Sequence, residues 1–424
     1  MVHCKKDAMS EKANSDLVRR QNRRIVLDAL RQQGNLARIE LGRATGLSPA
    51  SITAISAQLI EDDIIQEVDV PIGAALTGKR GRPIVRLSLK AAATHVVAVK
   101  ISIDDVVMAL TDFQGKVLAE QAIRIPTYQS EQAGFGRHLA EALHGFITGQ
   151  GLGTRDVARI GVAIQGVADN RSGSITWSPA FRARNVPIAP PIVARLGVPV
   201  MIANDANMIA EGLLSSDRAH ASGITAVIFT GYGVGMGLII NGKVYHGATG
   251  AASEFGHMNH LPEGALCRCG RRGCVEAYAA DYAILRSADG KGNDVAPLSA
   301  IDPERMTELM ARAHKGEAAA VAAYETAGAA LGFGIARLIA ILNPDRFVLA
   351  GPGTRALDLI EPALRRAIAD GVVEALSRQV TIEHVAFSTD MIMSGTINAL
   401  LRAVDHEVFS QGPLEKMRPL EKTG

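Results

Sequence analysis

The chain has little cysteine and few aromatic residues for its length. Its 424 residues include four cysteines and one tryptophan, and aromatic residues make up 4% of the total. So few cysteines exclude a disulfide framework as the main source of stability. No apolar run approaches the length of a membrane span, and residues 1–20 lack the apolar segment of a signal peptide. We therefore expect a cytoplasmic protein with no membrane partner.

The chain also lacks a strong overall charge. Its 45 Lys and Arg residues nearly balance 43 Asp and Glu residues, for a net charge of +2. The distribution is uneven, because residues 1–90 hold 15 basic and 10 acidic residues, a balance of +5 that leaves −3 for the rest. A basic N-terminal segment on a near-neutral body indicates a polyanionic partner. The length predicts two or three domains.

Three of the four cysteines fall within eight residues, at Cys267, Cys269 and Cys274, and His257 lies ten residues before the first. Three thiolates and one imidazole are the ligand set of a closed, structural zinc site. His260 could replace His257 as the fourth ligand. The alternative is that the cysteines are reduced and packed as small apolar side chains, but the Cys-x-Cys-x4-Cys spacing favours zinc.

Acidic residues flank this motif, and an Asn-Asp pair lies about 50 residues earlier in the chain. Glu254 and Glu276 flank the zinc ligands, where a metal-held loop would fix both carboxylates for bonding to sugar hydroxyls. Asn204 and Asp205 follow the apolar run 198–202. A strand that ends there and opens a helix places both side chains at a cleft. Asp205 could act as a general base, although either residue could equally cap the helix.

The N-terminal segment has the spacing of a helix-turn-helix. We predict helices over 16–33 and 36–44, then a turn and a helix that Ser48 caps. In the major groove of DNA, the exposed residues of this last helix nearest the bases would be Ala50, Ser51 and Thr53.

A basic loop follows, between a strand that begins near Ile65 and another that ends near Leu89. Lys79, Arg80 and Arg82 lie in this loop, which resembles a β-wing that places arginine in a narrow, A·T-rich minor groove. Turn spacing and basic wing together favour DNA binding. The alternatives are a generic helical packing unit with a solvated loop, or a protein-docking module.

Strands and glycine turns dominate the rest of the chain, in a pattern that occurs twice. Two antiparallel meanders are predicted, over 96–125 and 224–246, and each precedes a short buried strand, at 160–164 and 346–350. This repetition predicts a duplicated α/β domain whose two lobes enclose a cleft. Further helices are predicted at 303–315, 317–342, 356–369 and 392–409.

The motifs Glu-x-Gly-His and Cys-x-Cys-Gly-x-x-Gly-Cys-x-Glu, with Asn-Asp-Ala-Asn before them and Gly-Tyr-Gly-Val-Gly-x-Gly between, resemble the ROK family of sugar kinases and sugar-responsive repressors. The resemblance covers essentially the whole chain, and a winged helix-turn-helix before the lobes is similar to the repressor branch. It implies an actin/hexokinase-like fold of two ribonuclease-H-like lobes, and homodimers or higher homo-oligomers. It also implies that Asn204, Asp205, Glu254, His257 and Glu276 contact the sugar, and that His257 binds both the sugar and zinc.

The resemblance and the spacing together predict four segments. These are a winged helix-turn-helix over 1–90, a first lobe over 91–204 completed by a helix at 391–410, a second lobe over 205–390 that carries the zinc loop 254–276, and a tail over 411–424.

A ROK kinase needs a first phosphate loop of the form Asp-x-Gly-Gly-Thr, and here residues 100–104 read Lys-Ile-Ser-Ile-Asp. Phosphoryl transfer depends on positioning and charge neutralisation, so we expect no kinase activity and read Asp205 as a vestigial base. Tyr232 replaces a threonine in the second loop, and the glycines there and at 351–353 have the alternative role of tight turns. We therefore predict a repressor that binds a pseudo-palindromic operator under the control of a sugar. The alternative is an active sugar kinase with an added DNA-binding domain.

Overall fold

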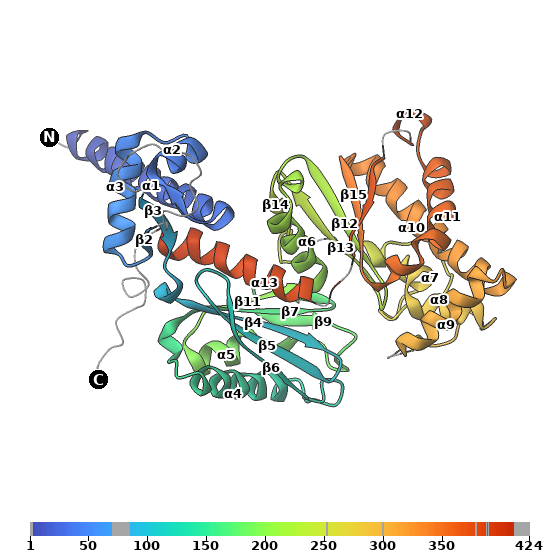
Figure 1. Ribbon diagram of the computed structural model, residues 1–424. Coiled ribbons are helices and arrows are strands. Elements are labelled where there is room, and N and C mark those ends of the chain that lie inside the picture. Colours follow the sequence, from blue (N-terminus) through green and yellow to red (C-terminus); the bar gives the residue numbers. More distant parts are fainter. Residues whose placement is uncertain are drawn as a thin grey trace.

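The computed structural model describes residues 3–69, 85–251, 253–298, 301–377, 380–386, 388 and 390–410. Helices and a small sheet form an N-terminal unit, and two five-stranded sheets follow along the chain, as Figure 1 shows. The N-terminal unit lies beside the first sheet, and the second sheet lies at the opposite end of the molecule.

The N-terminal unit contains three helices and a three-stranded antiparallel sheet of order β1-β3-β2. Its elements are α1 (His3–Gln33), β1 (Leu36–Ala37), α2 (Arg38–Thr45), α3 (Pro49–Glu61), β2 (Ile65–Asp69) and β3 (Val85–Leu89). Two predicted boundaries were wrong. The first helix begins at His3 rather than at residue 16, and Leu36 and Ala37 pair with β3 instead of opening a helix.

The turn between α2 and α3 follows from three residues. Gly46 has a φ of 71°, and its N–H bonds to the Gly42 carbonyl to end α2, a conformation that glycine adopts without strain. The Ser48 hydroxyl accepts a hydrogen bond from the Ser51 N–H at 3.2 Å, and Pro49 opens α3 as predicted. The predicted apolar face of α3 is buried, through Ile52, Ile55 and Leu59.

The two large sheets have the same strand order. Numbered within each sheet along the chain, the strands run 3-2-1-4-5, with the first three antiparallel and the last two parallel to the first. The predicted duplication is therefore present. The first sheet comprises β4 (His95–Ser102), β5 (Asp105–Asp112), β6 (Val117–Ile123), β7 (Val157–Ile164) and β11 (Val200–Asn204); the second comprises β12 (Ile224–Thr230), β13 (Val234–Ile240), β14 (Lys243–Val244), β15 (Arg346–Ala350) and β16 (Ile382–His384).

A third small sheet was not predicted. It has the order β10-β9-β8 and is made of β8 (Val167–Asp169), β9 (Ser174–Trp177) and β10 (Val186–Pro187). These strands are too short for a periodic apolar pattern to identify them.

The helices that cover the first sheet are α4 (Gly134–Gly149), α5 (Ala189–Leu196) and α13 (Asp390–Ala403). Helix α6 (Asp205–Ser216) packs mainly against the second sheet and against α13. The other helices beside the second sheet are α7 (Glu276–Ala279), α8 (Asp281–Ala288), α9 (Pro303–His314), α10 (Ala318–Leu342), α11 (Leu357–Gly371) and α12 (Glu374–Ser377). Short 3-10 helices occupy 91–93, 154–156, 218–221, 255–257 and 352–356. The predicted last helix ends at Ala403, and Val404–Phe409 continue it as a π-helix, η7.

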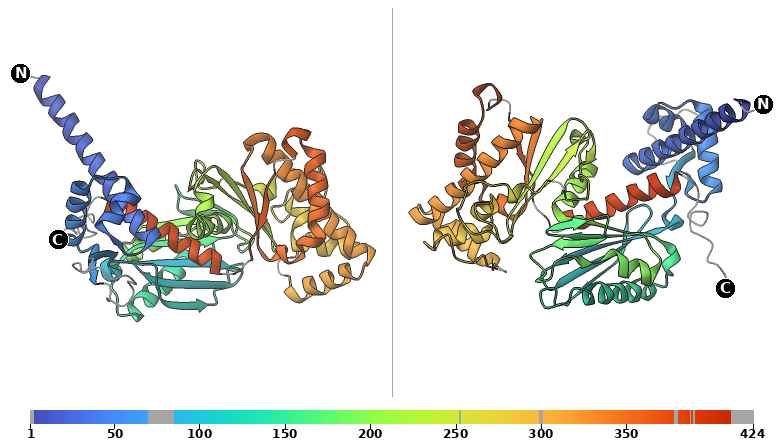
Figure 2. Two further views of the ribbon diagram at one scale, coloured as in Figure 1. Left: turned by 45° about the horizontal axis from the view of Figure 1, so that its top comes forward. Right: turned by 180° about the vertical axis from the view of Figure 1, so that it is seen from behind.

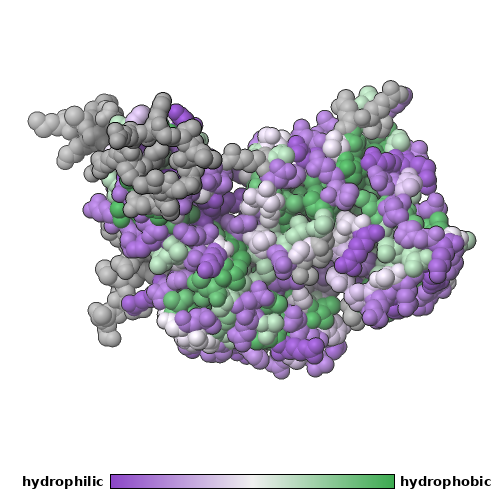
Figure 3. All heavy atoms as spheres, in the orientation of Figure 1, coloured by the Kyte–Doolittle hydropathy of each residue, from purple (hydrophilic) through white to green (hydrophobic). Residues whose placement is uncertain are grey.

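One expectation about membranes needs correction. By length and composition alone, α10 could cross a membrane, so an apolar stretch of that length does exist. In the structure, 56% of its most apolar window is buried, and residues such as Ala327, Leu331 and Ile335 form the core beside the second sheet. This packing is that of a core helix. The face drawn in Figure 3 is mainly polar, with separate apolar patches.

The C-terminal helix α13 returns to the first sheet and lies between that sheet and the N-terminal unit, as Figures 1 and 2 show. Its buried residues Met393, Ile397 and Leu400 share a core with Val96 and Ala98 of β4. This position joins the N-terminal unit to the first sheet through one shared core.

Helices α6 and α13 cross closely because both have glycine at the crossing. A Cβ on Gly395 would overlap the carbonyl group of Met208, and a Cβ on Gly212 would lie 3.2 Å from the carbonyl oxygen of Met391. The two helices therefore touch backbone to backbone, and a displacement of one requires a displacement of the other.

Candidate functional site

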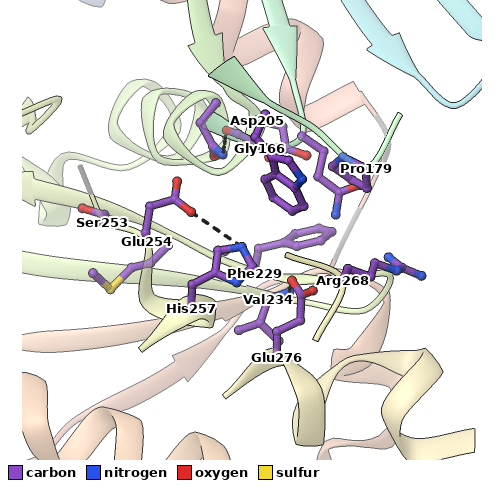
Figure 4. A pocket seen from close by; sticks show the side chains of 16 residues that line it. Gly166, Pro179, Asp205, Phe229, Val234, Ser253, Glu254, His257, Arg268 and Glu276 are labelled. Atoms are coloured by element: carbon purple, nitrogen blue, oxygen red, sulfur yellow. Dashed lines mark hydrogen bonds and ion pairs between the residues drawn. The ribbon is translucent and has the colours of Figure 1, made fainter. Parts of the chain in front are cut away.

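The five residues expected at a sugar site come together in one pocket between the two large sheets. The pocket is narrow, with a cavity volume of about 30 Å³. Figure 4 shows Asp205 on one side of it and Glu254, His257 and Glu276 on the other. It is lined by Gln165, Gly166, Trp177, Pro179, Asn204, Asp205, Phe229, Gly233, Val234, Gly235, Met236, Ser253, Glu254, His257, Arg268 and Glu276.

The wall on the first-sheet side is formed where β11 ends and α6 begins. Asn204 is the N-cap of α6, because its Oδ1 accepts the Ala206 N–H at 2.8 Å while its amide nitrogen donates to the Gly166 carbonyl at 2.7 Å. The capping role is therefore real for Asn204. Asp205 also accepts the Ala206 N–H through Oδ1, at 2.8 Å. Among the described residues its second carboxylate oxygen has no hydrogen-bond donor, so this oxygen can accept a hydroxyl.

Burial controls the electrostatics of this wall. It raises the pKa of Asp205 to about 6, against the opposing effects of the Ala206 backbone hydrogen bond and the Lys100 ammonium. At neutral pH the carboxylate is therefore mainly ionised, and it accepts hydrogen bonds without donating any.

The wall on the second-sheet side is formed by residues next to the cysteine cluster. Glu276 begins α7 and is buried, and its Oε2 accepts the Val234 N–H at 3.2 Å. His257 Nε2 lies 3.8 Å from Glu254 Oε2, the contact dashed in Figure 4. Burial raises the pKa of both glutamates. The two carboxylates flank one imidazole at the pocket surface.

The ligand atoms of His257, Cys267, Cys269 and Cys274 all lie within 4.8 Å of one another. Cys267 Sγ is 3.7 Å from His257 Nδ1, and Cys269 Sγ is 3.7 Å from Cys274 Sγ. A zinc ion about 2.3 Å from sulfur and about 2.0 Å from nitrogen separates its tetrahedral ligands by roughly 3.5–3.8 Å. The four side chains thus have the spacing and the chemistry of a metal-binding cluster.

The open choice of histidine is decided by side-chain packing. His260 lies outside the cluster, with its ring against Tyr278 at 5.1 Å and Phe333 at 5.9 Å. His257 instead turns Nδ1 to the sulfurs and Nε2 to the pocket. Hydrogen bonds from Cys267 and Cys274 lower the pKa of the Cys269 thiol, which favours the thiolate that binds metal.

Several pocket residues were not predicted from the sequence, and three of them make informative contacts. Gln165 and Trp177 come from the first-sheet side of the chain, and Arg268 lies between two of the cysteines. Trp177 packs edge-on against His257, with ring centroids 5.4 Å apart. Arg268 donates to the Tyr232 carbonyl at 2.6 Å and stacks on Tyr282. The chain has only one tryptophan, and that rarity was the one signal available.

The segments that correspond to the phosphate loops of ROK kinases are held by hydrogen bonds and close packing within the protein. Ile103 and Asp104 form the two-residue turn between β4 and β5, with Asp104 at a φ of 56°. The Asp104 carboxylate accepts the Thr127 N–H at 2.9 Å. A Cβ on Gly351 would overlap the Thr230 carbonyl, and a Cβ on Gly231 would overlap the Pro352 ring. Packing alone therefore requires these glycines.

The candidate DNA-contacting residues lie on α3 and in the segment after β2. Ala50 and Thr53 are exposed and Ser51 is half-buried, while Ser48 caps the helix. Lys79, Arg80 and Arg82 lie outside the described residues.

The comparisons with known proteins agree with this architecture. The chain is 27% identical to the "DNA-binding transcriptional repressor Mlc" of Escherichia coli K12, over 92% of this chain and 95% of that protein. It is 29% identical to the "DNA-binding transcriptional dual regulator NagC" of the same strain, over 87% of this chain and 89% of that protein. It is also 27% identical to a "Glucokinase" of Streptomyces coelicolor, over only 65% of this chain and 88% of the enzyme.

Among solved structures, one described as a ROK family transcriptional regulator, a homolog of the E. coli MLC protein, superposes with a TM-score of 0.76. It is 24% identical and covers 94% of this chain and 99% of its own, so it supports the fold. The ROK family model matches residues 96–401, which contain both large sheets, the pocket and the cysteine cluster. The chain belongs to the ROK family.

Proposed function

We propose that this protein is a sugar-responsive, DNA-binding transcriptional regulator of carbohydrate genes, and that it acts as a repressor in the cytoplasm. The observation that carries the proposal is the physical connection of a polar interlobe pocket to the helical N-terminal unit through α6 and α13. Mlc and NagC are named as DNA-binding regulators, and their similarity extends into the N-terminal segment. The glucokinase similarity spans only 65% of the chain.

The N-terminal unit is proposed to be a winged helix-turn-helix. Helix α3 would lie in the major groove with Ala50, Ser51 and Thr53 towards the bases. The segment between β2 and β3 would be the wing, and Lys79, Arg80 and Arg82 would contact the minor groove and phosphates. A homodimer or higher homo-oligomer would present two such units to a pseudo-palindromic operator.

The pocket is proposed to bind the sugar by accepting its hydroxyl hydrogens. Asp205, Glu254 and Glu276 offer carboxylate oxygens from two sides, which suits neighbouring hydroxyl groups on one ring. Asn204 positions Asp205 by capping α6, and His257 would contact the sugar through Nε2. A ligand held by both walls draws the lobes together, and its effect depends on binding the closed state better than the open one.

The cysteine cluster is proposed to hold a structural zinc ion through His257, Cys267, Cys269 and Cys274. Four protein ligands leave no open position, so the ion would supply rigidity rather than chemistry. Its function would be to fix Glu254 and Glu276, which flank the ligands in the sequence.

The proposed signal passes from the pocket to the DNA-binding unit along two helices. Helix α6 begins at the pocket and crosses α13 at the Gly212–Gly395 contact. Helix α13 leads into η7, where the fully buried Asp405 accepts a bond from Arg31 of α1 at 2.9 Å. A shift of α6 would in this way move α1 and change the separation of two α3 helices in a dimer.

Further contacts reinforce the junction between η7 and α1. Arg23 of α1 donates to the Phe409 carbonyl at 3.1 Å, and Asp28 pairs with His406 at 2.8 Å. Phe409 packs edge-on against Phe113, with ring centroids 4.9 Å apart. The packing of α13 on β4 and β7 supports assigning the helix over 391–410 to the first lobe, beside residues 91–204, with 205–390 as the second lobe and 1–90 as the DNA-binding domain.

The kinase alternative is disfavoured by residues 100–104. Lys100 stands where a kinase would hold an aspartate, and the Asp104 carboxylate is bound to Thr127 in a turn too tight to enclose a phosphate. Glycine is required at positions 231 and 351 because a Cβ there would overlap neighbouring atoms, so these glycines are not evidence of a phosphate site. We infer that the chain does not transfer phosphate and that Asp205 acts as a binding residue.

A gel-retardation assay of the zinc-loaded protein on its own upstream DNA, with a panel of hexoses, N-acetylhexosamines and pentoses, tests the proposal. One sugar should change the DNA affinity by roughly 5- to 150-fold, and added salt should weaken the complex. Asp205→Asn should bind DNA but show a weaker response to that sugar. Robust sugar-dependent ATP turnover, or no salt-sensitive DNA complex, would overturn it.

A further inference from the structure

A second cavity lies beside the second large sheet, apart from the polar walls of the sugar pocket. It has a volume of about 470 Å³, within the usual range for small-molecule sites. Ile284 of α8, Met306 and Met310 of α9 and Ile360 of α11 form apolar walls. The cavity could therefore enclose the flat, apolar faces of a ring system.

One buried carboxylate faces this apolar space. Asp281 is 7% exposed and lines the cavity, and its backbone N–H bonds to the Gly231 carbonyl at 2.8 Å. Among the described residues, no side chain or backbone group forms a hydrogen bond or an ion pair with the Asp281 carboxylate. A buried carboxylate without a partner is costly, so a ligand with N–H donors would be stabilised here.

The charge of this carboxylate limits the ligand. Burial raises the pKa of Asp281 to about 6, while Arg268 and Arg355 oppose the rise. At neutral pH the group is therefore mainly ionised and only accepts hydrogen bonds. The two arginines already balance its charge at longer range, which makes a neutral donor a better partner than a second cation.

The geometry of a carboxylate further selects the donor pattern. Its two oxygens accept two parallel N–H bonds from one planar group. Guanine presents adjacent ring and exocyclic N–H donors, whereas adenine presents a donor beside an acceptor nitrogen that would face a carboxylate oxygen. The Gly351-Pro352-Gly353 turn, which the family resemblance relates to adenosine binding, borders the same cavity. Asp281 thus opposes adenine at this place.

Tyr232 lies at the boundary between this cavity and a neighbouring space on the side of the sugar pocket. It lines both the cavity and the neighbouring space next to Lys100 and Asp205. A base in the cavity would not contact a sugar bound at Asp205. The cavity and the sugar pocket share no lining residue, so a ligand can bind here without a sugar in place.

We propose that this cavity binds a guanine-type heterocycle, with Asp281 accepting its two adjacent N–H groups and the Ile and Met side chains packing on the ring. This inference goes beyond the proposed sugar response and does not depend on it.

Isothermal titration calorimetry of the full-length, zinc-loaded protein with guanosine, inosine and adenosine tests the proposal. Guanosine should bind roughly ten- to a hundred-fold more tightly than adenosine, and inosine, which has only the ring N–H, should fall between them. In Asp281→Asn, the side chain offers one acceptor and one donor, so the preference should reverse towards adenosine.

Two further measurements make the result decisive. Met310→Trp should fill the cavity and abolish binding of both nucleosides, while melting temperature and sugar binding report whether each variant is folded. The proposal is wrong if folded wild-type protein does not bind guanosine, or if Asp281→Asn binds the nucleosides in the wild-type order. Neither result would bear on the sugar response.

Discussion

The two large sheets share one strand order, yet they hold their sides of the pocket by different means. On the first-sheet side, Asn204 and Asp205 are fixed by the end of β11 and the first turn of α6. On the second-sheet side, Glu254 and His257 lie on a loop with little regular structure, next to the cysteine cluster. Backbone hydrogen bonds hold the first wall, whereas the proposed zinc ion would hold the second.

The sheets also differ in their outward connections. Helix α13 packs on the first sheet and continues into η7, which contacts α1 of the N-terminal unit. Among the described elements, the first sheet is therefore the one with a direct connection to that unit. The second sheet reaches that unit only through the pocket and α6, which packs against β13 and α13. Under the proposed function, both copies of the duplicated architecture would contribute to ligand recognition, and only the first would transmit the signal to the N-terminal unit.

Removal of the proposed zinc ion should have the largest effect, because it would free the pocket residues on the second-sheet side and leave those on the first-sheet side in place. Chelation, or Cys269→Ser, should reduce sugar affinity by more than about a hundred-fold and lower the melting temperature. Zinc content by atomic emission, calorimetric sugar binding and thermal melting measure the effects. Cys4→Ser, outside the cluster, is the matched control.

Unchanged zinc content and melting in Cys269→Ser would show that the cluster does not hold a structural ion. The fluorescence of Trp177 gives an internal check, since its ring lies 5.4 Å from His257 across the pocket.

Disrupting the contact between η7 and α1 should leave both sides of the sugar pocket intact. Arg31→Met removes the partner of the buried Asp405 carboxylate, and Asp405→Asn in the same chain removes the charge left behind. The double variant should bind sugar as the wild type does, while the sugar-dependent change in DNA affinity, roughly 5- to 150-fold in the wild type, falls towards one.

Paired sugar titrations and gel-retardation curves measure both quantities on one preparation. Arg365→Met, at an exposed ion pair with Glu361, is the control and should preserve the response. A double variant that keeps the full response excludes this junction as the route.

The smallest expected effect is a dependence of sugar affinity on pH, through Asp205 on the first-sheet side of the pocket. The pKa of Asp205 is raised to about 6, so the acceptor is ionised above that pH and protonated below it. Sugar affinity should therefore fall about ten-fold between pH 7 and pH 5. The same raised pKa means that the charged carboxylate disfavours folding as pH rises through 4 to 6, so acidification should not unfold the protein through this group.

Calorimetric titration across this range checks the prediction, and Asp205→Asn should show a flatter profile. An identical pH dependence in the variant would assign the titration to another group.

The amino-acid pattern predicted the parts of the fold that repeat. Both meanders, the strands at 160–164 and 346–350 and the face of α3 carry strong periodicity, and they occur as expected. The spacing of Cys267, Cys269 and Cys274 likewise predicted a cluster that the structure contains. Local patterns suffice where one element determines its own geometry.

Features that depend on distant parts of the chain were missed. Trp177 lies in a four-residue strand whose pairing depends on β8 and β10. Asp281 lines a cavity whose other walls include residues of α9 and α11, which lie later in the chain. The N-terminal extension of α1 to His3 has no apolar periodicity, so propensity alone could not have placed its start.

The position of α13 also has a consequence for the order of synthesis. Val96 and Ala98 are buried against a helix that is made about 300 residues later, and α1 is held by Asp405 in the same late segment. A ribosome releases the N-terminal unit long before that helix exists. We expect the nascent unit to lack its fixed orientation until the chain is nearly complete, so that unfinished chains compete poorly for paired operator half-sites.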